Sequence, residues 1–154
     1  MKINELNQKP GIDKNIKLEK TYTQFGKLLI ELRKKNLPDR IVVFINKDVE
    51  ELNSITGPGD ELRKIARKKQ TRIIKSLEKE LKLVPKNYYR NLWLAVGMAV
   101  FGIPIGAAFG AGLGNMAFLG IGLPIGLVIG MAVGTGMDKK AFKEGRQIDL
   151  EIKY

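Results

Sequence analysis

Residues 91–137 read NLWLAVGMAVFGIPIGAAFGAGLGNMAFLGIGLPIGLVIGMAVGTGM, a run of 47 residues without a single Asp, Glu, Lys or Arg. An apolar helix of about 20 residues crosses the hydrocarbon core of a bilayer. A single helix of the whole run would rise about 70 Å, far beyond a core of about 30 Å. The run therefore predicts a transmembrane pair of helices, near residues 92–112 and 117–137, joined by a turn at residues 113–116. A re-entrant hairpin that enters and leaves on one side is the alternative.

The run also repeats itself. FGIPIG at residues 101–106 is followed, twenty residues on, by IGLPIG at residues 121–126. Glycine recurs every fourth residue in both copies, so the glycines of each helix lie on one face. Glycine lowers helix stability in water, but a strip without side chains lets another helix backbone come close. The glycines expected to pack helices together are Gly102, Gly106, Gly110, Gly114, Gly122, Gly126, Gly130 and Gly134.

On these two runs, residues 97–136 resemble the glycine-zipper membrane proteins, a grouping that includes channels, membrane-active toxins and envelope proteins. The resemblance implies tight helix association rather than one particular activity. The glycines either pack the two helices of one hairpin together or also join neighbouring chains. We predict that they also join chains, which makes the protein a homo-oligomer.

Three prolines are candidate hinges. Pro104 and Pro124 occupy equivalent positions of the repeat, and each lacks the N–H that would bond one turn back, so a kink or local unwinding is expected. A packed kink and a paired hinge or pore constriction both fit this pattern. Pro85 precedes the first apolar helix and is a candidate joint.

Basic and aromatic residues at both ends of the run predict its orientation. Positively charged flanks stay on the cytoplasmic side of a membrane, so both termini are expected in the cytoplasm, with the bacterial inner membrane as the location if the source is a bacterium. Tyrosine and tryptophan favour the headgroup region. The residues expected at lipid headgroups, anionic ones above all, are Lys82, Lys86, Tyr88, Tyr89, Arg90, Trp93, Lys139 and Lys140.

The front of the chain, residues 1–86, is predicted to form a small basic cytosolic helical domain. Residues 1–90 carry 22 Lys and Arg against 12 Asp and Glu, a net charge of +10. Apolar spacing predicts helices near residues 17–36 and 60–83.

Two further segments are ambiguous between helix, strand and coil. Residues 41–55 fit the helical period, although the β-branched run at residues 41–45 is also typical of a strand. We favour the helix. Residues 138–154 are expected to form a cytosolic tail whose end, residues 147–154, alternates like a strand. Such a strand would pair with residues 41–45 or with a neighbouring chain, and a disordered end is the alternative.

The helix expected at residues 60–83 is strongly basic. Three alternative roles fit its Lys and Arg residues. They form the solvated face of a core helix, they contact anionic lipid headgroups, or they bind nucleic acid. Nucleic acid is not expected as a partner, because the nearby membrane already accounts for the charge. The basic residues are Arg63, Lys64, Arg67, Lys68, Lys69, Arg72, Lys75 and Lys79.

The composition argues against catalysis. The chain has no cysteine and no histidine, which excludes zinc sites built on these residues and Ser-His-Asp or Cys-His arrangements. Carboxylates such as those of Glu50, Glu51, Glu78 and Glu80 lie among lysines, where side chains are usually solvated, and no pair is placed for acid–base chemistry. We expect no enzyme, no cofactor and no metal.

These features together predict a mainly α protein: a cytosolic helical domain at residues 1–86, a two-helix transmembrane hairpin with glycine zippers at residues 87–137 and a short tail at residues 138–154. The predicted function is that of a non-catalytic integral membrane protein that self-associates into an oligomeric assembly and presents the helical domain to a cytosolic protein partner. The alternative is a pore-forming or membrane-disrupting effector gated by the cytosolic domain.

Overall fold

The computed structural model describes residues 1–9, 12, 15–57 and 59–153, and it is mainly helical. The chain divides into two compact units. The first contains residues 1–84 and residues 148–152, and the second is made mainly of residues 85–147.

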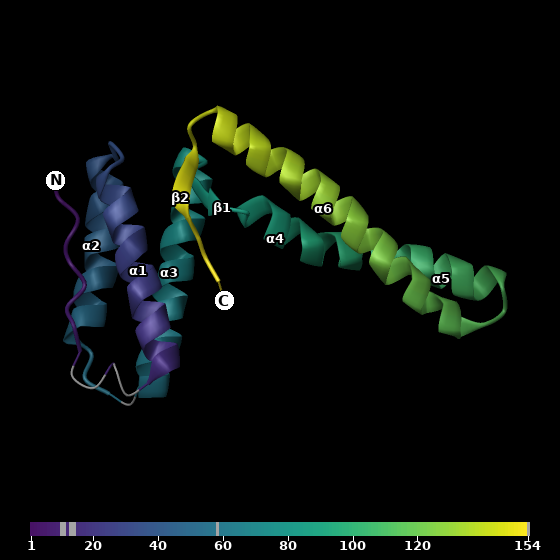
Figure 1. Ribbon diagram of the computed structural model, residues 1–154, viewed down its shortest axis with the longest axis horizontal. Helices are drawn as coiled ribbons and strands as arrows, with labels where there is room; N and C mark the ends of the chain where they lie inside the picture. The colour runs from purple at the N-terminus through teal and green to yellow at the C-terminus, as the bar shows by residue number, and fades with distance from the viewer. Residues whose placement is uncertain (10–11, 13–14, 58, 154) are drawn as a thin grey trace. The chain divides into compact units, whose positions relative to one another are not determined.

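Three helices build the first unit: α1 (Ile16–Arg33), α2 (Asp39–Ser54) and α3 (Gly59–Leu81) (Figure 1). Helices α1 and α2 each pack against α3. Asn15 caps α1, because its side-chain oxygen accepts a hydrogen bond from the N–H of Leu18 at 3.1 Å. The core is apolar, as the helical spacing predicts. Its main buried side chains are Leu18, Tyr22, Phe25, Leu28, Leu29, Leu32, Ile41, Val42, Ile45, Val49, Leu52, Leu62, Ala66, Ile73, Ile74 and Leu77.

The helical interpretation of residues 41–55 is confirmed, and the strand alternative for residues 41–45 is wrong. Ile41 and Ile45 lie one helical turn apart and are both buried, whereas Val43 between them is half exposed. Helical packing of one apolar face therefore outweighs the local β preference of this run.

A charged cluster lies between α2 and α3. Asp48 is fully buried, and its Oδ1 is 3.1 Å from Nζ of Lys69 and 3.3 Å from Nη1 of Arg72. Lys69 also donates to Glu51, while Arg72 stacks over the ring of Phe44 at 4.7 Å from its centroid. Of the three roles left open for the basic residues of this helix, a position on the solvated face is wrong for Lys69, since the residue is only 8% exposed. A buried carboxylate on the facing helix draws the ammonium inward.

This cluster shifts two pKa values. Burial by itself lowers the pKa of Lys69, but hydrogen bonds and charge from Glu51 and Asp48 outweigh it and raise that pKa. The hydrogen bond from Lys69 lowers the pKa of Glu51. Both shifts favour the ionised forms, as expected of a paired cluster.

Two short strands pair into one sheet: β1 (Val84–Lys86) and β2 (Gln147–Glu151). The strand predicted at the end of the chain is confirmed, but the partner suggested for it at residues 41–45 is wrong. Its partner is β1, which the sequence marks only as a joint next to Pro85. Three residues are too few to show an alternating pattern, although Val84 and Ile148 are both fully buried.

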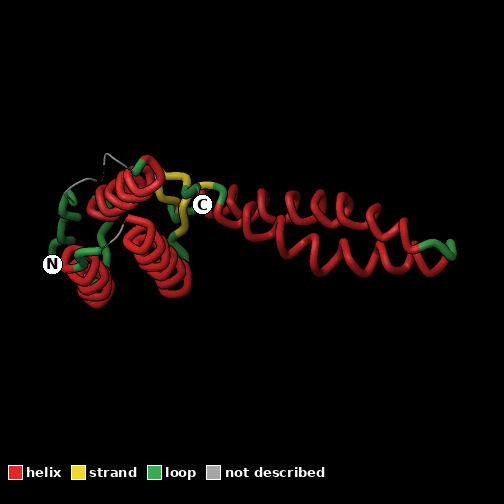
Figure 2. Tube along the Cα trace, turned by 90° about the horizontal axis from the view of Figure 1, so that it is seen from below, coloured by secondary structure: helices red, strands yellow, loops and turns green. Residues whose placement is uncertain are grey.

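The second unit contains the apolar run. It consists of α4 (Tyr88–Gly97), a π-helical turn (Met98–Gly102), α5 (Ile103–Gly112), a 3₁₀ turn (Met116–Phe118) and α6 (Leu119–Lys143). Two continuous helical stretches, residues 88–112 and 116–143, are long and apolar enough to cross a membrane. Helix α6 lies alongside α4 and α5 (Figures 1 and 2).

The predicted turn is also present. It occupies the residues between α5 and the 3₁₀ turn, where Gly114 has φ of 64°. Asn115 accepts a hydrogen bond from the N–H of Ala117 at 2.9 Å, which closes the turn.

Candidate membrane-spanning helix pair

Glycines line the contact between the two apolar helices. A Cβ atom built on Gly122 would lie 2.7 Å from Cα of Gly106, and one built on Gly126 would lie 2.7 Å from Cα of Gly102. Real Cβ atoms essentially never approach other atoms more closely than 3.0 Å. No other residue type fits these positions at this separation. We call the surface formed by Gly97, Gly102, Gly106 and Gly110 with Gly122, Gly126, Gly130 and Gly134 the glycine contact.

Seven of the eight glycines selected from the sequence belong to this contact. At its two ends, Gly134 packs against the backbone of Arg90, and Gly110 packs against Met116. Gly114 is the exception: it lies in the turn, and a Cβ there would have nothing within 4 Å. Its positive φ explains the glycine, because L-residues with side chains rarely adopt that backbone conformation.

Gly97 is a contact residue that sequence reasoning missed. It precedes Gly102 by five residues, which breaks the four-residue interval. The π-helical turn between them absorbs the extra residue, because π-helical hydrogen bonds span five residues instead of four. The N–H of Ile103 accordingly donates to the carbonyl of Met98. As a result, a Cβ at Gly97 would lie 2.7 Å from Cα of Gly130 on the opposite helix.

The candidate hinge prolines occupy three different settings. Pro104 is the second residue of α5, two residues after the end of the π-helical turn, and its missing N–H is the local signal for the unwinding in that turn. Pro124 lies inside the continuous helix α6. Pro85 is the buried central residue of strand β1.

The large apolar side chains of this unit point outward. Few residues of either helical stretch are buried, and most of the buried ones are glycines. A core helix of a water-soluble protein has the reverse arrangement, with large side chains buried. The exposed large side chains are Leu92, Val100, Ile103, Phe109, Leu113, Met116, Ile121, Leu123, Ile125, Val128, Met131, Val133, Met137 and Phe142.

Asp138 ties the beginning of α4 to the end of α6. Its carboxylate accepts hydrogen bonds from the N–H of Tyr89 at 3.0 Å and of Arg90 at 2.9 Å. The first N–H groups of a helix have no partner within the helix, and the positive end of the helix dipole favours a negative charge. Asp138 is 7% exposed. Sequence reasoning missed this cap, although an acidic residue directly after an uncharged run of 47 is a usable signal.

The residues expected at lipid headgroups differ in exposure. Tyr89 is buried and packs edge-on against Tyr88, with ring centroids 5.2 Å apart. The remaining seven are at least partly exposed: Lys82, Lys86, Tyr88, Arg90, Trp93, Lys139 and Lys140.

No protein-family model, no curated protein and no solved structure matches this chain. Within the described ranges, no group of three or more Asp or Glu residues is placed to hold a metal ion. The function of the protein therefore has to be inferred from its residues and their geometry.

Proposed function

We propose that this chain is a non-catalytic integral membrane protein in which a glycine-zipper hairpin anchors a small helical domain at the cytoplasmic face. The observation that carries the proposal is the packing of the second unit, which is the reverse of that in a water-soluble protein. Its glycines face inward and its large apolar side chains face outward.

The outward side chains favour a hydrocarbon environment. Val128 is 64% exposed and Ile103 is 52% exposed. Each fully exposed aliphatic or aromatic side chain of this size gains about 1.5–3 kcal/mol on leaving water. The exposed large apolar side chains of this unit are 37% to 69% exposed, so each gains part of that free energy. Together they make a large favourable term for membrane insertion, whereas in water they would form a large apolar patch that promotes aggregation.

The dimensions of the helices are compatible with spanning. The stretch at residues 88–112 has 25 residues and rises about 38 Å, which exceeds a hydrocarbon core of about 30 Å. Lys86 precedes it, Arg90 lies in its first turn, and Lys139 and Lys140 lie in the last part of the second stretch. Basic residues at both ends support a cytoplasmic location for both termini and a contact with anionic headgroups.

A second candidate function is a homo-oligomeric assembly, of which a pore is one form. The glycine contact is filled by helices of the same chain, so association between chains would use the outward faces. Gly112, Gly120 and Gly136 support this candidate, because a Cβ at any of them would meet nothing within 4 Å in this chain. Glycine costs about 1 kcal/mol relative to alanine in a helix, and close packing with a second copy would offset that cost.

Cysteine labelling tests the anchor. The chain contains no cysteine, so each introduced cysteine is the only one. Asn115→Cys should react with a membrane-impermeant maleimide added outside intact cells. Lys2→Cys should react only after permeabilisation, and the unmodified protein is the control. An Asn115→Cys variant that is protected from the outside while Lys2→Cys behaves as expected would contradict two full crossings.

The mass of the purified protein in nanodiscs tests the second candidate. A defined multiple of the 17.2 kDa chain would support an oligomer and justify conductance measurements. A monomer would mean that the glycines pack helices only within one chain, and the membrane anchor would then be the one remaining candidate function.

A further inference from the structure

The first residues of the chain lie along α2 and are held through their main chain (Figure 1). We call residues 2–9 the arm. The side-chain amide of Asn46 on α2 makes two hydrogen bonds to it. Its Oδ1 accepts from the N–H of Asn4 at 2.8 Å, and its Nδ2 donates to the carbonyl of Lys2 at 3.0 Å. This asparagine therefore binds one main-chain donor and one main-chain acceptor.

Asn53 repeats the same arrangement further along α2. Its Oδ1 accepts from the N–H of Asn7 at 2.9 Å, and its Nδ2 donates to the carbonyl of Glu5 at 2.9 Å. Asn53 follows Asn46 by seven residues, a helical rise of about 10.5 Å. The bound amides are three residues apart, which in an extended chain corresponds to about 10 Å. The two asparagines thus match the repeat of an extended main chain and can bind it largely independently of its sequence.

Arg33, the last residue of helix α1, contacts both the main chain and one side chain of the arm. Arg33 donates from Nε to the carbonyl of Ile3 at 3.1 Å and from Nη2 to the carbonyl of Asn4 at 2.9 Å. It also forms an ion pair with Glu5 at 3.2 Å. Ile3 is the one buried residue of the arm, at 4% exposure. An apolar side chain at the position of Ile3 and a carboxylate two residues later are therefore two features of sequence that this site can select. The side chains of Asn4 and Lys9 add contacts to Glu50 and to the carbonyl of Ile55.

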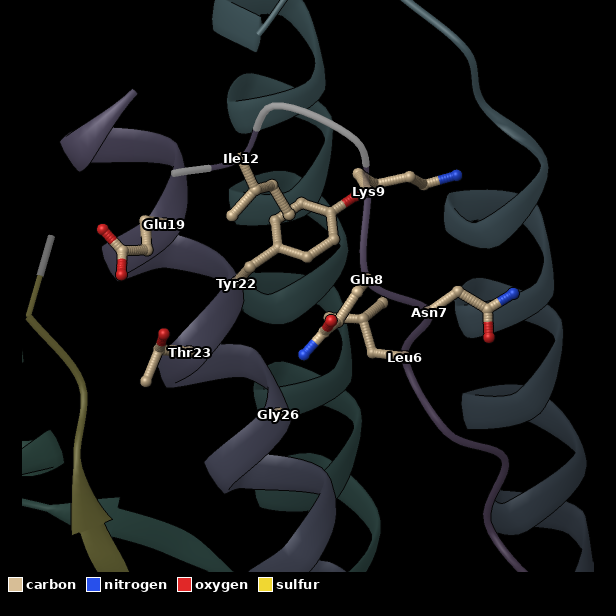
Figure 3. Close-up of a pocket in the computed structure, with 9 residues that line it drawn as sticks. All are labelled: Leu6, Asn7, Gln8, Lys9, Ile12, Glu19, Tyr22, Thr23 and Gly26. Carbon is tan, nitrogen blue, oxygen red and sulfur yellow. The ribbon is translucent and has the colours of Figure 1, made fainter. Parts of the chain in front are cut away.

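The site is wider than the arm that fills it. A cavity of about 460 Å³ lies between Leu6 and Tyr22, with the residues of the arm on one side and those of α1 on the other (Figure 3). A second cavity of about 280 Å³ lies at the other end of the arm, beside Leu32 and Val42.

We propose that this face of α2 is a binding site for an extended peptide segment and that the chain's own arm occupies it in cis. The partner is an extended segment with an apolar side chain at the position of Ile3 and an acidic side chain at the position of Glu5. It replaces the arm in trans. Main-chain hydrogen bonds supply affinity and one or two side-chain contacts supply specificity, as in other modes of recognition of extended peptides. The proposal does not depend on the membrane function.

The test uses a fluorescent peptide with the sequence of residues 2–9, KINELNQK, and the full-length protein in nanodiscs. Ile3→Asp removes the apolar anchor of the arm, so this variant should bind the peptide saturably. The unmodified protein should bind at least about tenfold more weakly, because a tethered competitor has an effective concentration in the millimolar range. Helical circular dichroism establishes that the variant is folded. If Ile3→Asp unfolds the domain, Asn4→Pro replaces it, since proline removes the N–H that Asn46 binds.

Two controls make the outcome decisive. Adding Asn46→Ala and Asn53→Ala to the variant should weaken peptide binding at least about tenfold, because four hydrogen bonds to the main chain are lost. A peptide with aspartate in place of the isoleucine should also bind at least about tenfold more weakly. A folded variant that does not bind the peptide overturns the proposal, and so does binding that is insensitive to both asparagine substitutions.

Discussion

Replacing Gly122 with alanine should destabilise the apolar helix pair, whereas the same change at Gly120 should stabilise it. The two positions lie two residues apart on α6. A Cβ at Gly122 would meet Cα of Gly106 at 2.7 Å and the carbonyl of Gly102 closer still. A Cβ at Gly120 would meet nothing within 4 Å. Backbone atoms cannot rotate aside as a flexible side chain can, so the helices have to separate to admit the methyl group.

The expected change in the free energy of unfolding follows from comparing the two variants. Alanine gains about 1 kcal/mol over glycine in a helix, and this gain applies equally at both positions. Overpacking a tight contact costs about 1–3 kcal/mol. The cost for Gly122→Ala should lie near the upper end of this range, because the new methyl group would overlap several backbone atoms. Gly120→Ala should therefore be about 1 kcal/mol more stable than the unmodified protein. Gly122→Ala should be about 2 kcal/mol less stable, a difference of about 3 kcal/mol between the two variants.

The assay is reversible unfolding from detergent micelles with increasing SDS, followed by circular dichroism and by the fluorescence of Trp93, the single tryptophan. Trp93 is a useful reporter because its carbonyl group lies against Gly130 in the glycine contact. Equal stability of the Gly120→Ala and Gly122→Ala variants would refute close packing of the helices through Gly122.

Three more perturbations have defined outcomes. Asp138→Ala removes the cap of α4 and should cost about 1–2 kcal/mol in the same SDS titration; no loss would contradict the capping role. Lys69→Met removes the nearest cation from the buried Asp48 carboxylate but leaves Arg72 at 3.3 Å, so it should cost about 1–3 kcal/mol in thermal unfolding, against little change for the exposed neighbour Lys68→Met. Burial raises the pKa of Tyr22 from 10.0 to about 12, so its contribution to stability is complete below pH 10 and is lost as the pH rises through about 12. Tyr22→Phe should flatten the curve of melting temperature against pH between about pH 10 and 12. An unchanged slope would contradict the raised pKa of Tyr22.

Local patterns in the sequence determined most of the secondary structure. Helices α1, α2 and α3 follow from the spacing of apolar residues such as Leu18, Tyr22 and Phe25, because that spacing depends only on residues one or two turns apart. The uncharged run likewise identifies two helices long and apolar enough to cross a membrane, because length and apolar composition are properties of consecutive residues. The four-residue interval of glycines selected seven of the eight residues in the contact for the same reason.

Only the tertiary structure decided how separate segments meet. The π-helical turn that brings Gly97 into the glycine contact, the cap that Asp138 provides for α4 and the pairing of β2 with β1 all join residues that no local pattern relates. The same holds for Asn46 and Asn53. In the sequence they are ordinary polar residues of a helix, and only the structure shows that they bind the main chain of the arm. Hydrogen bonds and close contacts depend on distance in space, and a run of consecutive residues specifies distance only over the few positions that one helix or strand spans.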